Sequence, residues 1–96
     1  MPKERNNQID EFFQIATHNL KIGNYQNAKK YFEIILNIDS KNVFALYNLG
    51  IVFQELGDLE RAIEAYEKVL RLKPKNLEHV YLGLGIVFKA IGDYKK

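Results

Sequence analysis

The amino-acid sequence predicts an all-α fold in which antiparallel pairs of helices stack into a short solenoid. Three dipeptides, Gly23-Asn24, Gly57-Asp58 and Gly92-Asp93, recur 34 and 35 residues apart in a chain of 96. A glycine can adopt the left-handed conformation that ends a helix, and Asn or Asp after it can cap the next helix. Apolar residues keep helical spacing between these dipeptides, and no segment shows the alternation of a half-buried strand. A period in the mid-thirties is typical of helical arrays, whose units bury apolar surface against their neighbours.

The first predicted helix covers about residues 8–22 and follows a polar N-terminal arm, residues 1–8, that we expect to be frayed. Its partner begins after Asn24 and carries apolar residues along one stripe. Asn42 is then placed to cap the helix that follows. These two helices form a first predicted repeat, residues 9–42.

The second predicted repeat, residues 43–77, contains helices over about 43–56 and 59–72. Both carry apolar residues at helical spacing on the side that we expect to be buried. Pro74 ends the second of them, because proline has no backbone N–H to donate and its ring clashes with the preceding turn.

The last predicted segment, residues 78–96, is a truncated third repeat that holds one helix and one corner. Its helix covers about residues 77–91, and Gly92-Asp93 forms the corner. A chain of this size has room for a single modest core. We therefore expect the three repeats to form one structural domain.

Composition indicates a soluble globular protein. Hydrophobic residues make up 47% of the chain and charged residues 27%, which is ordinary for a folded domain. The net charge of +2 is too small to indicate nucleic acid or an acidic membrane by itself, and the absence of cysteine excludes disulfides and thiolate metal sites. The N-terminus lacks the apolar region of a signal peptide, and no apolar run approaches the ~20 residues that cross a bilayer. The cytoplasm is the default expectation.

With its corners in register, the chain resembles the tetratricopeptide repeat family. The second repeat carries most of the family pattern: Leu46, Leu49-Gly50, Phe53, Gly57-Asp58, Ala62, Tyr66, Val69 and Pro74. The first repeat matches more loosely, with Asn19 where an aromatic residue is expected, and the third matches at Tyr81, Leu84-Gly85 and Phe88. The resemblance implies a right-handed α-solenoid of five helices, two full repeats plus the first helix of a third.

The resemblance also implies a function. In this family the first helices of successive repeats line a concave groove, so we expect a non-catalytic module that binds a peptide or protein partner there. The groove positions correspond to ten residues, most of them apolar or aromatic: Phe13, Gln14, Thr17, Phe44, Tyr47, Asn48, Ile51, His79, Leu82 and Ile86. Such a surface suits an extended or helical peptide with apolar anchors. Alternatively, some of these side chains belong to the core between repeats or to a dimer seam.

One specialised form of the family grips the acidic C-terminal tails of heat-shock chaperones with two Lys, two Asn and one Arg or Lys. The corresponding positions here hold Phe13, Thr17, Asn48, His79 and Leu82. Asn48 alone agrees, and apolar side chains cannot neutralise a carboxylate. We therefore expect no carboxylate clamp in this chain.

The third corner ends in Asp93, which would cap a helix that the sequence does not contain. Four apolar side chains are predicted to line the face on which that helix would pack: Tyr81, Leu84, Phe88 and Ile91. Leaving such side chains in water forgoes roughly 1.5–3 kcal/mol each. We therefore expect a homodimer through this C-terminal helix, with its geometry, domain-swapped or face-to-face, left open. The alternatives are a fragment of a larger repeat protein and a last helix that acts as a cap.

The sequence gives little support for catalysis, metal binding or nucleic-acid binding. His18 and His79 are far apart and have no cysteine or spaced carboxylate cluster beside them, which argues against catalysis and a metal site. No glycine-rich phosphate loop is present. Five lysines give the C-terminal third a basic tilt, but acidic residues are interleaved with the charges elsewhere. We predict no enzyme activity, no cofactor, no nucleic-acid partner and no membrane partner.

Overall fold

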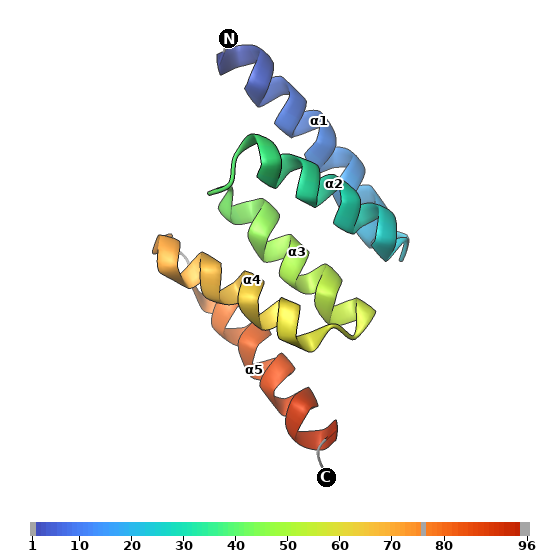
Figure 1. The fold of residues 1–96 in the computed structure, drawn as a ribbon, viewed down its shortest axis with the longest axis vertical. Coiled ribbons are helices and arrows are strands. Elements are labelled where there is room, and N and C mark those ends of the chain that lie inside the picture. Colours follow the sequence, from blue (N-terminus) through green and yellow to red (C-terminus); the bar gives the residue numbers. More distant parts are fainter. Residues whose placement is uncertain (1, 76, 95–96) are drawn as a thin grey trace.

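The computed structural model describes residues 2–75 and 77–94, and within them the chain forms five helices and no strands. Successive helices run in opposite directions and stack along the long axis of the molecule, with the two termini at opposite ends (Figure 1). The predicted all-α helical array is thereby confirmed. The helices are α1 (Pro2–Lys21), α2 (Tyr25–Ile38), α3 (Val43–Leu56), α4 (Leu59–Leu72) and α5 (Glu78–Tyr94).

Two predicted corners form as left-handed turns. Gly23 has a φ of 82° and Gly57 a φ of 80°, a region that side chains with a Cβ rarely occupy. The helix α4 ends in the same conformation at Lys73, where φ is 51°, immediately before Pro74. The predicted ends of α3 and α4 therefore agree with the structure, and each end has a local backbone cause.

The helix caps differ from one another. The Oδ1 of Asn42 accepts a hydrogen bond from the backbone N–H of Ala45 at 3.0 Å, as the sequence predicted for the start of α3. The Oδ1 of Asp58 accepts one from the N–H of Arg61 at 3.3 Å at the start of α4. Asn24, by contrast, makes no side-chain cap hydrogen bond, so α2 begins without this support.

The third predicted corner does not form. The helix α5 continues through Gly92-Asp93 to Tyr94, and Gly92 does not take a positive φ. Continuing the helix keeps its backbone groups hydrogen-bonded.

The N-terminal arm expected at residues 1–8 is not a separate segment either. Residues 2–8 belong to α1, which begins at Pro2, while residue 1 lies outside the described residues. Proline suits the first position of a helix because its fixed φ is helical and its missing N–H would have no partner there. The prediction of a frayed arm is corrected accordingly.

The core runs as one cluster through all five helices. The ring of Tyr66 on α4 is 1% exposed and lies against two glycines, Gly50 on α3 and Gly83 on α5. A Cβ placed on Gly50 would lie 2.6 Å from Cε1 of Tyr66, and one on Gly83 would lie 2.8 Å from its Cζ. These glycines let three helices approach one aromatic ring, because any larger residue would collide with it.

Candidate functional site

The structure brings two predicted groove residues together at the start of α3. Phe13 on α1 and Phe44 on α3 line one open recess of about 310 Å³. Phe13 is partly buried and packs edge-on against Phe32, with ring centroids 5.9 Å apart, whereas Phe44 is 71% exposed. The other lining residues are Ile9, Asp10 and Asn42, which the sequence analysis did not assign to the groove. The helical spacing of Ile9 and Phe13 was the available signal.

A second pair meets farther along. The ring of Tyr47 on α3 lies with its centroid 6.4 Å from the ring of His79 on α5 and 5.9 Å from the ring of Tyr66 on α4. Tyr47 is half-buried and His79 is exposed. Aromatic pairs at these separations interact favourably beyond their buried area. Tyr47 therefore links the predicted groove surface to the core beneath it.

The polar groove residues are held by their own helices. The Oγ1 of Thr17 donates to the carbonyl of Phe13 at 2.9 Å, and the Nδ2 of Asn48 donates to the carbonyl of Phe44 at 2.8 Å. The second of these hydrogen bonds fixes the orientation of the Asn48 amide. Since the Oδ1 of Asn48 accepts no hydrogen bond from the described residues, it is available to a partner's N–H.

The remaining predicted groove residues lie on α1, α3 and α5. Gln14 on α1 is exposed, and Ile51 on α3 is partly buried against the core. Leu82 and Ile86 on α5 are 63% and 48% exposed, which leaves two large apolar side chains in water one turn apart. Exposed apolar surface of this kind is typical of interaction sites.

The electrostatics of the site are simple. Asp10 is the one charged residue among those that line the recess of Phe13 and Phe44. Burial raises the pKa of the Tyr66 hydroxyl above its usual value, and the nearby Tyr47 and Glu55 raise it further. Across residues 2–75 and 77–94, no three His, Cys, Asp or Glu side chains are grouped so that they could hold a metal ion.

The predicted self-association face divides into two parts. Leu84 is 8% exposed and Ile91 is partly buried, because both pack into the core of their own chain; the prediction that they face outward is corrected. Tyr81 and Phe88 remain 60% and 56% exposed, as expected. The outward surface of α5 therefore keeps two aromatic rings uncovered.

A further recess of about 300 Å³ lies between α2 and α4 over α3, and the sequence analysis did not anticipate it. Its floor is apolar, formed by Leu46, Leu49 and Phe53. Charged side chains of both signs form its rim: Glu33, Arg61, Glu64 and Lys68.

The structure also shows no helix within its described part that is long and apolar enough to cross a membrane.

Comparison with known families gives two matches, both described as tetratricopeptide repeat. One covers residues 43–76 and the other residues 12–42. Together they cover the second half of α1 and all of α2, α3 and α4, and leave α5 outside. Their shared boundary falls at Asn42, which caps α3.

Relatives and solved structures agree with this assignment. The chain is 32% identical over 87 residues to the protein CTR9 homolog of Arabidopsis thaliana, covering 86% of this chain and 8% of that protein. MamA from Desulfovibrio magneticus RS-1 aligns with a TM-score of 0.80 and 28% identity over 92% of this chain and 49% of that one. The first tetratricopeptide domain of Spaghetti (RPAP3), in complex with an HSP90 peptide, aligns with a TM-score of 0.75 and 22% identity over 80% of this chain and 60% of that one.

Proposed function

Because the chain belongs to the tetratricopeptide repeat family, and is thereby a protein-interaction module, we propose that it binds a peptide partner along α1, α3 and α5. The observation that carries the proposal is the line of aromatic and apolar side chains on these three helices. It runs from the recess of Phe13 and Phe44, through Tyr47 and His79, to the exposed Leu82. The module acts by binding, without a catalytic step.

The chemistry of this surface defines the ligand. Phe44 and Leu82 offer apolar contacts at its two ends, and the Oδ1 of Asn48 offers an acceptor for a peptide N–H between them. Asp10 beside the recess favours a cationic side chain there over an acidic one. The ligand that fits is an extended or helical peptide with apolar anchors and a Lys or Arg near one of them.

The HSP90-peptide complex of the RPAP3 domain shows that a fold of this kind holds a peptide. The clamp positions in the present chain hold Phe13, Thr17, Asn48, His79 and Leu82, and four of these five side chains differ from the clamp pattern. We therefore propose that this module selects apolar anchors rather than a C-terminal carboxylate.

A peptide array tests the proposal. The probe is a set of dodecamers that carry two apolar anchors at varied spacing, with Lys or Asp beside one anchor, and binding is followed by fluorescence anisotropy. We expect micromolar binding to a subset with Lys, and at least tenfold weaker binding for Leu82→Asp and for Tyr47→Ala. Glu60→Ala, on the exposed surface of α4, is the matched control and keeps wild-type affinity. Unchanged affinity in both groove variants would place binding elsewhere.

Self-association through α5 is a second candidate function. The observation that favours it is the exposure of Tyr81 and Phe88, at 60% and 56%. Their counterparts one repeat earlier, Leu46 and Phe53, are 5% and 7% exposed and form part of the recess between α2 and α4. The same kind of surface is thus covered in the second repeat and bare in the third.

A further inference from the structure

Four residues of α5 form one outward stripe in which large and small side chains alternate. Tyr81, Gly85, Phe88 and Gly92 are spaced by four, three and four residues, which places them on one side of a helix. Both rings are exposed, and a Cβ placed on either glycine would meet nothing within 4 Å. We call these four residues the α5 stripe.

The second repeat shows how such a stripe is covered. The equivalent positions one repeat earlier are Leu46, Gly50 and Phe53 on α3 and Gly57 at its C-cap. The antiparallel α4 packs against α3, whereas a Cβ placed on Gly57 would meet nothing within 4 Å. The ring of Tyr66 on α4 occupies the space above Gly50, close enough that a Cβ would collide with it. A glycine at this position therefore leaves space for an aromatic ring above it, and we call this space the seat of the ring. Gly85 has the same position on α5 and its seat is empty.

We propose that the α5 stripe packs antiparallel against the same stripe of a second copy of this chain. In the antiparallel register centred between Ile86 and Val87, Phe88 of one copy lies over Gly85 of the partner subunit. Tyr81 then lies over Gly92 of the partner subunit in the same register, because both pairs of residue numbers add up to 173. Each ring fills the space above a glycine, and the two-fold symmetry repeats both contacts.

The pattern favours a second copy over another occupant because the stripe complements itself. A single register places both aromatic rings opposite glycines, and each copy supplies rings and seats in equal number. The antiparallel direction is the one that α3 and α4 already use within the chain. No charged side chain belongs to the stripe, so its burial leaves no unpaired charge.

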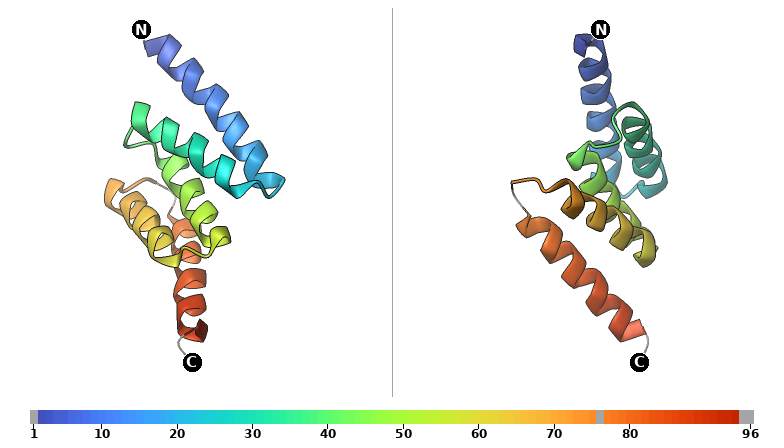
Figure 2. Two further views of the ribbon diagram at one scale, coloured as in Figure 1. Left: turned by 45° about the vertical axis from the view of Figure 1, so that its right-hand side comes forward. Right: turned by 60° about the vertical axis from the view of Figure 1, so that its left-hand side comes forward.

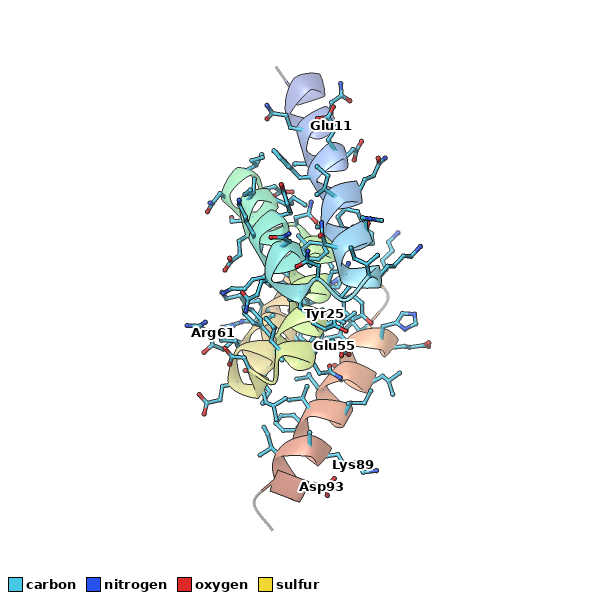
Figure 3. The ribbon with its side chains drawn as sticks, turned by 90° about the vertical axis from the view of Figure 1, so that its right-hand side faces the viewer. Glu11, Tyr25, Glu55, Arg61, Lys89 and Asp93 are labelled. Atoms are coloured by element: carbon cyan, nitrogen blue, oxygen red, sulfur yellow. The ribbon has the colours of Figure 1, made fainter. Side chains whose placement is uncertain are left out.

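Access to the stripe is open in the structure. The C-terminal half of α5 extends beyond α4, which is visible from two further directions (Figure 2). Figure 3 shows the labelled Lys89 and Asp93 near the end of α5, clear of the other helices. A second α5 can therefore approach without displacing any helix of the first copy. The contact is small compared with a standard interface, so we expect a dissociation constant on the order of 10–100 µM.

Sedimentation equilibrium of the full chain from 5 to 500 µM tests the dimer. We expect the wild-type mass to rise from monomer to dimer over this range, and Phe88→Asp to weaken association by at least tenfold. Ile22→Asp is the matched control, because Ile22 is an exposed apolar residue outside α5, and it keeps the wild-type dimer. Circular dichroism of each variant checks that the helices remain folded. A monomeric wild type at 500 µM overturns the proposal and leaves the stripe to another protein.

A swap of the ring and its seat tests the register. Gly85→Phe alone places rings opposite rings, so we expect it to abolish the dimer while the chain stays folded, since the space at Gly85 is open. The double variant Gly85→Phe with Phe88→Gly restores one ring and one seat in the same register and regains the dimer. If Gly85→Phe dimerises as well as wild type, or the swap fails to recover association in a folded chain, the proposed register is wrong.

This proposal deepens the second candidate function, and its failure can be told apart from failure of peptide binding. Phe88→Asp removes the dimer and keeps the anisotropy response to peptides, whereas Leu82→Asp weakens the peptides and keeps the dimer. A single variant that loses both properties would overturn the separation of the two surfaces.

Discussion

The hydroxyl of Tyr66 shows how one side chain combines packing with a polar requirement. Its ring is buried between helices, and its hydroxyl donates a hydrogen bond to the Oε1 of Gln54 at 3.0 Å. Because the ring is nearly inaccessible to water, ionising the phenol would leave a charge in the core. Its pKa is raised for this reason above all. The neutral form is therefore the one that folding stabilises.

Raising the pH above about 10 should therefore destabilise the chain through Tyr66, because 10 is the ordinary pKa of tyrosine in an unfolded chain. A group whose folded pKa is raised contributes stability that is fully present below that pH and lost as the pH rises through the folded value. We expect a loss of about 1.4 kcal/mol at pH 11 from this residue alone. Urea unfolding of wild type and Tyr66→Phe at pH 7, 9 and 11 measures it. Tyr66→Phe lacks this part of the loss. At pH 7 we expect this variant to be less stable than wild type by about 0.5–1.5 kcal/mol, because it lacks the hydrogen bond to Gln54. Equal alkaline losses in both proteins would contradict the prediction.

Two glycines on the same helix face, one repeat apart, should respond in opposite ways to alanine. Gly50→Ala forces a methyl group against the Tyr66 ring and should cost about 1–3 kcal/mol. Gly85→Ala meets no atom and gains helix propensity, so we expect stabilisation by roughly 0.5–1 kcal/mol. Thermal unfolding at 5 µM, below the dissociation constant expected for the dimer, compares the two variants. Destabilisation by Gly85→Ala at this concentration would show that its space is already filled.

At this scale the sequence predicted the core of the second repeat well. Gly50 and Tyr66 were both assigned from the pattern of small and aromatic residues, and the structure places them in contact. Gly83 was missed because the family pattern assigned the glycine of the third repeat to Gly85. The contact between Gly83 and Tyr66 depends on how α5 docks across α4, which no local pattern encodes.

The helices α2 and α3 differ in how their N-termini are capped. Asn42→Ala should cost about 0.5–2 kcal/mol, because it removes the hydrogen bond to the N–H of Ala45. Asn24→Ala should cost less than about 0.5 kcal/mol, since Asn24 makes no side-chain cap hydrogen bond. Chemical unfolding followed by circular dichroism measures both variants under the same conditions. Similar losses for the two would show that Asn24 caps α2 in solution.

Helix boundaries were predictable where a cap or a corner residue sets them. The helices α3 and α4 begin and end where Asn42, Gly57-Asp58 and Pro74 predicted, since these residues act on the adjoining backbone. The outer ends of α1 and α5 were misplaced, because α1 begins at Pro2 instead of about residue 8 and α5 continues through Gly92-Asp93 to Tyr94. A helix there continues as long as its own backbone hydrogen bonds favour it.

The groove was predictable only as a set of positions. Mapping the family's positions placed Phe13 and Phe44 in the predicted groove, and in the structure both line the same recess. Their role in binding stays a prediction. Asp10 was missed because its role depends on the angle at which α1 crosses the start of α3. Such angles arise from packing between helices, and sequence spacing alone leaves them open.

For the molecule as a whole, stability should be lowest at α5. The helix α3 contacts all four other helices, whereas α5 contacts α3 and α4. In a solenoid each unit is stabilised by its neighbours, so an end helix opens at lower free energy than a central one. Native-state hydrogen exchange at 5 µM should therefore show α3 exchanging slowest and the C-terminal half of α5 fastest. Raising the concentration to 500 µM should slow exchange in α5 for wild type, because the dimer then covers the α5 stripe. Exchange in α5 of Phe88→Asp should stay unchanged, because this variant does not form the dimer. Uniform protection across α3 and α5 at low concentration would contradict this gradient and point to a chain that unfolds as one cooperative unit.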